Sequence, residues 1–111
     1  MGTSRSPETG GWTAGASVYS GRRDPTWPIP VELGFRLERL WNQLPPWSGA
    51  RPRPPPLGYR GCSLVAPDGR EWTAFQELVI QAVDARRDRD REFERLVIAS
   101  APPGILPPIS L

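Results

Sequence analysis

Cys62 carries the most reactive side chain in the sequence, and it stands in the segment GYRGCSLV, two residues after Arg60. On a regular strand, residues two apart point to the same face, so the Arg60 guanidinium and the Cys62 thiol would be neighbours. A nearby cation lowers the pKa of a thiol and favours the nucleophilic thiolate. One hypothesis is therefore a small thiol-dependent enzyme or redox protein that uses Cys62. The alternative, which we favour, is a buried and inert cysteine that fills a small space in the core.

Most other catalytic chemistries are excluded by residue types that the sequence lacks. All fourteen basic residues are arginine, and the chain has no histidine. It therefore cannot form a Ser-His-Asp or Cys-His pair, a phosphate-binding loop with its lysine, a Schiff base or a histidine metal site. Asp68 and Glu71 could form a carboxylate pair, but we interpret them as a turn-former and a surface charge. We predict a protein that is not an enzyme and that uses no metal and no cofactor.

Aromatic and arginine side chains offer a second kind of chemistry, the binding of another molecule. The segment YSGRRDPTWPIP, residues 19–30, is braced by three prolines and contains two arginines and a tryptophan. If the next proline-rich segment folds back across a sheet, six residues would gather on one surface. They are Arg22, Arg23, Trp27, Trp47, Tyr59 and Arg60. In the alternative interpretation the segment is only a stiff corner, in which Trp27 covers the N-terminal end of the first helix.

The first helix is the clearest element that could position these residues. Pro30 suits the first helical position, and a stripe of helical period follows it until Pro45 ends the helix. The stripe consists of Leu33, Leu37, Leu40, Trp41 and Leu44. Before this helix, Asp24 and Pro25 predict a type I turn in which the carboxylate accepts the backbone N–H of Thr26 or Trp27.

A second helix is predicted from Asp88, which can cap its start, to the residues before Pro102. Its apolar face holds Phe93, Leu96 and Val97, with Ser100 on the same side. The run RRDRDREFER has charges of alternating sign at helical spacing, which is typical of a solvated helix face. We expect the pairs Asp88 with Arg91 and Glu92 with Arg95 on it.

The remaining segments predict strands and extended connections. Residues 14–20 form a first strand, residues 59–66 and 70–75 a hairpin, and residues 77–83 a further strand or, alternatively, a helix; we favour the strand because of its β-branched residues. Residues 45–58 are a proline-rich connection. The sequence therefore predicts an α+β fold, with a small antiparallel or mixed sheet of roughly three to four strands and two amphipathic helices on one face. A single domain at 14–101 would lie between a disordered tail at 1–13 and a proline-rich tail at 102–111.

The segments YSGRRDPTW, PPPLGYRG and LVIASAPPGILP together resemble a small, mainly bacterial protein family with the patterns YSGRxDPxW and PPLGYRG. The resemblance covers most of the chain from Val18 to Pro107. The family has no known activity, so the resemblance implies no catalytic or binding residue in this chain.

Charge and hydropathy constrain the partner. A formal net charge of +2 is too small to imply nucleic acid, whose phosphates require several convergent cations. No apolar run reaches the roughly 20 residues of a membrane helix, and the N-terminus lacks the pattern of a secretory signal. We therefore expect a cytoplasmic module that binds a protein or peptide and does not enter a membrane. The alternatives are the thiol chemistry of Cys62 and weak binding of single-stranded nucleic acid.

Overall fold

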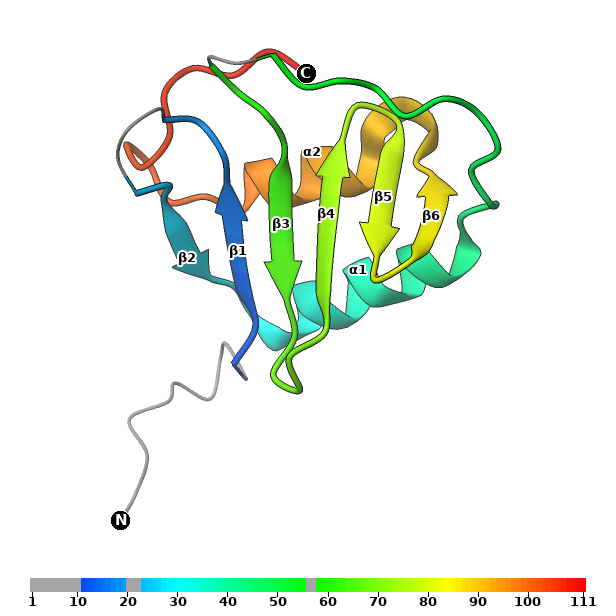
Figure 1. The fold of residues 1–111 in the computed structure, drawn as a ribbon. Coiled ribbons are helices and arrows are strands. Elements are labelled where there is room, and N and C mark those ends of the chain that lie inside the picture. Colours follow the sequence, from blue (N-terminus) through cyan, green and yellow to red (C-terminus); the bar gives the residue numbers. More distant parts are fainter. Residues whose placement is uncertain (1–10, 20–22, 56–57) are drawn as a thin grey trace.

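The structure is a computed structural model that describes residues 11–19, 23–55 and 58–111. In this part of the chain, six antiparallel strands form one sheet in the order β2-β1-β3-β4-β5-β6 (Figure 1). The strands are β1 (Thr13–Ala16), β2 (Thr26–Pro28), β3 (Cys62–Val65), β4 (Glu71–Phe75), β5 (Leu78–Gln81) and β6 (Asp84–Arg87). The helices are α1 (Val31–Gln43), the 3-10 helix η1 (Arg89–Arg91) and α2 (Glu92–Ala99).

Both α-helices lie behind the same face of the sheet, whereas no helix covers its front face (Figure 1). The predicted α+β class with two helices is confirmed, and residues 77–83 contain strand β5 rather than a helix. The sheet has more strands than the sequence predicted, because β2 and β6 were not expected. None of the helices in the described ranges is long and apolar enough to span a membrane.

Three tryptophans anchor the core between the sheet and the helices: Trp12, Trp27 and Trp72 are each at most 2% exposed. The rings of Trp12 and Trp72 stack with centroids 6.1 Å apart. Gly34 of α1 lies directly against Trp12, since a Cβ at position 34 would come within 2.3 Å of the Trp12 ring. Trp12 and Thr13, which the sequence analysis assigned to a disordered tail, therefore belong to the folded domain, because the Trp12 side chain fills part of the core.

Helix α1 buries the stripe that the sequence predicted. Leu37 and Trp41 are buried, and Leu33, Leu40 and Leu44 are partly buried against the same core. Pro30 is the residue before the first helical residue, with an extended backbone, rather than the first residue of the helix itself. The first turn then begins at Val31.

Helix α2 begins differently from the prediction. Asp88 does cap it, because its carboxylate accepts the N–H groups of Phe93 (3.0 Å) and Glu94 (3.2 Å). The expected pairs Asp88 with Arg91 and Glu92 with Arg95 do not form; instead Arg91 pairs with Glu94 at 2.8 Å. Glu94 is fully buried rather than solvated, since the α2 face that it occupies turns toward the core.

Residues 45–55, which we call the proline strap, run from the end of α1 along the β6 edge of the sheet. The Trp47 N–H donates to the Ala85 carbonyl (2.9 Å), and the Arg87 N–H donates to the Pro45 carbonyl (2.8 Å). These bonds satisfy backbone groups of an edge strand that would otherwise invite pairing with another chain. The strap then continues along one end of the sheet toward β3 (Figure 1).

The C-terminal residues 102–111 were expected to form a tail, but they contact the domain. Ile105, Leu106 and Ile109 are partly buried against the core. In addition, an Arg95 Nη2–H donates to the Leu111 carbonyl at 3.3 Å.

Candidate functional site

Of the six residues expected on one binding surface, the five that the structure describes do not lie together. Trp27 is 2% exposed and its Nε1–H donates at 2.9 Å to the hydroxyl of Ser100, the residue that follows α2, so it is a core residue. Trp47 is half-buried beside β6, at the edge of the sheet opposite to β2, which holds Trp27. Arg23 is exposed, and Arg22 lies outside the described residues.

Tyr59 and Arg60 are adjacent in sequence but extend to different places. The Tyr59 hydroxyl donates to the carboxylate of Glu94, on the helix side of the sheet. The Arg60 guanidinium donates to the Tyr19 carbonyl (2.6 Å) and lies 3.8 Å from the Asp24 carboxylate. Arg60 and Cys62 do not lie on one face of a strand as expected. Gly61 between them has a φ of 119°, which interrupts the alternation of a regular strand.

Asp24 fixes the chain between β1 and β2, although not as the predicted type I turn. Its Oδ1 accepts the N–H groups of Val18 (3.0 Å) and Tyr19 (3.1 Å), rather than those of Thr26 or Trp27. The bond from Tyr19, supported by the bond from Val18 and the charge of Arg60, lowers the pKa of the Asp24 carboxyl despite partial burial. Asp24 and Arg60 therefore use their charges to hold the segments around β1, β2 and β3 together.

Cys62 is buried in surroundings that disfavour a thiolate. Its exposed fraction is 4%, and burial followed by the nearby charge of Glu94 raises the pKa of its thiol. The Tyr59 hydroxyl beside it also has a raised pKa, mainly because of burial. The Glu94 carboxylate accepts hydrogen bonds from Arg91 and Tyr59, so its charge is balanced within this cluster. The geometry matches the inert cysteine of the sequence analysis better than the nucleophile.

A groove lies on the face of the sheet that no helix covers. Strand register places five residues side by side across this face, and all five line the groove. They are Thr26 of β2, Gly15 of β1, Ser63 of β3, Thr73 of β4 and Ile80 of β5. Gly15 has no side chain, and Thr26, Ser63 and Thr73 carry only short ones. This row therefore forms a hollow floor. Neighbouring strands are about 4.8 Å apart, so the floor is about 19 Å across.

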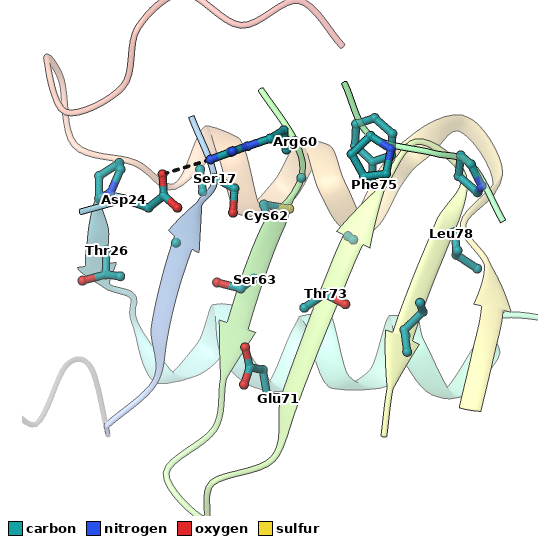
Figure 2. A pocket seen from close by; sticks show the side chains of 18 of the residues that line it. Ser17, Asp24, Thr26, Arg60, Cys62, Ser63, Glu71, Thr73, Phe75 and Leu78 are labelled. Carbon is teal, nitrogen blue, oxygen red and sulfur yellow. Dashed lines mark ion pairs between the residues drawn. The ribbon is translucent and has the colours of Figure 1, made fainter. Parts of the chain in front are cut away.

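Larger side chains wall the groove at the end of the sheet where the proline strap passes. Phe75 and Leu78 stand there, and Pro52 and Pro54 of the strap also line the groove. Figure 2 shows Arg60, Phe75 and Leu78 at this end, with Ser63 and Thr73 below them on the open face. The volume of this half-open groove is about 490 Å³, which lies within the range of about 300–1,000 Å³ typical of ligand pockets.

Two charged residues of the groove have no partner among the residues that the structure describes. Arg51 of the strap and Glu71 of β4 both line the groove, are exposed, and make no side-chain hydrogen bond or ion pair there. Arg51 also lies near Gln76 and Glu77, in the turn after Phe75. Glu71 is at the opposite end of β4 (Figure 2). The groove thus has an unpaired cation at one end and an unpaired anion at the other.

Most of the groove is lined by short polar and aliphatic side chains and not by the aromatic residues of the expected binding surface. The alternation in CSLV and EWTAF, in which Cys62, Leu64, Trp72 and Ala74 are buried, already implies that Ser63 and Thr73 face the other way. Arg51 gave no comparable signal, since its position depends on the path of the strap. Of the five residues of the expected binding surface that the structure describes, Arg60 alone lines the groove.

Among the described residues, no three His, Cys, Asp or Glu side chains are grouped so that they could hold a metal ion. Comparisons of the chain with protein-family models, with curated proteins and with solved structures gave no match.

Proposed function

We propose that the protein is a non-enzymatic module that binds an extended segment of a protein or peptide in the groove on the open face of its sheet. The observation that carries this proposal is the hollow row of Thr26, Gly15, Ser63, Thr73 and Ile80, walled by Phe75, Leu78 and the proline strap. The floor, about 19 Å wide across the strands, leaves room for an extended chain that lies along them.

The chemistry of the groove suits a polypeptide. Hydroxyl groups of Thr26, Ser63 and Thr73 can donate to and accept from peptide groups, and the half-buried Ile80 and Phe75 offer apolar surface to a side chain. The strap contributes proline rings whose backbone is already restricted, so closing around a ligand orders little additional chain.

A selection experiment tests the surface. Thr73 is exposed on the floor between Ser63 and Ile80, and Thr73→Tyr fills the groove with a residue type that strands accept well. Phage-displayed random peptides selected on the unchanged protein should lose at least about tenfold in affinity, or about 1.4 kcal/mol, on Thr73→Tyr.

The matched control is Thr13→Tyr. It adds the same ring on the same face of the sheet, because Thr13 is two residues from Gly15 on β1, but Thr13 does not line the groove. Selected peptides should bind this variant normally. Equal binding to Thr73→Tyr and Thr13→Tyr would show that the groove is not the binding surface, provided that both variants unfold at the temperature of the unchanged protein.

A further inference from the structure

The unpaired charges of the groove indicate what kind of peptide it binds. This inference rests on the function proposed above. Arg51 and Glu71 lie at opposite ends of β4, and neither has an ion-pair partner in the described part of the chain. The other two charges of the lining, Arg60 and Asp24, are 3.8 Å apart and compensate one another. Of the four charged residues that line the groove in the described part of the chain, Arg51 and Glu71 are therefore the two available to a ligand.

The sum of these four charges is zero, which argues against a polyanion. Nucleic acid requires several convergent cations, whereas a strand of phosphates along this groove would meet Glu71 at one end. A ligand that carries one negative and one positive group would satisfy both ends. A peptide with an acidic and a basic side chain has this chemistry.

The strand geometry sets the spacing of these groups. Glu71 and Phe75 are four residues apart on β4, which corresponds to about 13 Å. Arg51 lies beside the turn that follows Phe75. An extended peptide covers the same distance in about four residues. We propose that the groove recognises an extended peptide whose carboxylate meets Arg51 and whose cation, about four residues away, meets Glu71.

Charge reversal provides the test, with peptides selected from the random library as probes. Arg51 and Glu71 are both exposed, so Arg51→Glu and Glu71→Arg should leave the fold intact. Each reversal should lower the affinity for the selected peptide by about tenfold or more, since it replaces the attraction between opposite charges by repulsion between like charges. Raising the salt concentration should weaken binding to the unchanged protein, because exposed charges are screened.

Rescue makes the test specific. A peptide in which the acidic residue is changed to lysine should bind Arg51→Glu better than it binds the unchanged protein. Arg36→Glu is the matched control, because Arg36 is exposed on α1 and outside the groove lining. Arg36→Glu should leave the affinities for the selected peptide and for the altered peptide unchanged.

The outcomes separate the inference from the proposed function. If selected peptides depend on Thr73 but carry no consistent charge, and neither reversal changes their affinity, the charge inference is wrong while the groove remains the binding surface. If a labelled oligothymidine binds the groove and Glu71→Arg strengthens that binding, the partner is a polyanion and the inference is overturned. The inference is supported if both reversals lower the affinity of the selected peptide and the peptide with lysine in place of its acidic residue binds Arg51→Glu better than the unchanged protein.

Discussion

At the residue scale, the close contact between Gly34 and Trp12 reverses the usual effect of replacing a helical glycine by alanine. Replacing glycine by alanine inside a helix normally stabilises it by about 1 kcal/mol. At position 34 the added methyl group would lie 2.3 Å from the Trp12 ring, which is itself stacked on Trp72. We expect Gly34→Ala to lower the free energy of unfolding by about 1–3 kcal/mol.

Urea denaturation followed by tryptophan fluorescence measures this effect. Asn42→Ala is a suitable control, because Asn42 is exposed on the same helix, and it should be neutral or slightly stabilising. A Gly34→Ala protein as stable as Asn42→Ala would mean that α1 packs on Trp12 less closely than the structure shows.

The buried thiol of Cys62 gives a second prediction at this scale. Because burial and the charge of Glu94 raise its pKa, the thiolate should be scarce in the folded protein. Iodoacetamide should therefore not modify Cys62 in the native state between pH 7 and about 8.5, the range below and at the pKa of a free thiol. In urea at the same pH, modification should be rapid. Native-state modification at the rate of the unfolded chain would restore the thiol-dependent hypothesis.

At the scale of elements, Asp24 links the end of β1 to the start of β2 and makes stability depend on pH. Its folded-state pKa is below that of the unfolded chain, so the ionised carboxylate stabilises the folded state above about pH 3.9. This stabilisation is lost as the pH falls through the lowered folded-state pKa. The group is partly exposed, with 36% of its side chain accessible, so solvent weakens its interaction with Arg60.

Asp24→Asn should lower the free energy of unfolding by about 1 kcal/mol at pH 7, and should reduce the loss of stability on acidification. Thermal unfolding between pH 7 and about pH 3 follows both quantities. In Asp90→Asn, the control, the carboxylate that is removed makes no hydrogen bond or ion pair in the described structure, so the pH profile should match that of the unchanged protein. If the two variants have the same pH profile, Asp24 does not have this role.

The elements that the sequence predicted well are those with strong local patterns, namely α1 with its stripe from Leu33 to Leu44 and the hairpin of β3 and β4. Strand β2 has three residues, follows Pro25 and ends in Pro28, and DARR of β6 has no apolar alternation, so neither carries a strand signal of its own. Both form because a neighbouring strand and, for β6, the proline strap pair with them. Glu94 was expected on the solvated face of the charged run, but it lies on the buried side of α2 beside Phe93 and Val97, where Tyr59 and Arg91 donate hydrogen bonds to it.

At the scale of the whole molecule, the two α-helices lie on one side of the sheet and leave a groove on the other (Figure 1). The aromatic residues that suggested binding are largely used inside the fold, with Trp12, Trp27 and Trp72 in the core. The open face instead presents short hydroxyl side chains between charged ends. The candidate site thus depends on the packing of the complete domain, and the sequence indicated it only through Arg60 and the period of the strands.

The most direct test of the proposed groove is to locate a selected peptide on the protein by intermolecular nuclear Overhauser effects. The methyl groups of Thr73 and Ile80 face the groove, whereas Leu33 and Leu40 belong to α1 on the other side of the sheet. We predict contacts from the peptide to Thr73 and Ile80 and none to the two leucines. Contacts to Leu33 and Leu40, without contacts to Thr73 and Ile80, would contradict the account and place binding on the helical layer.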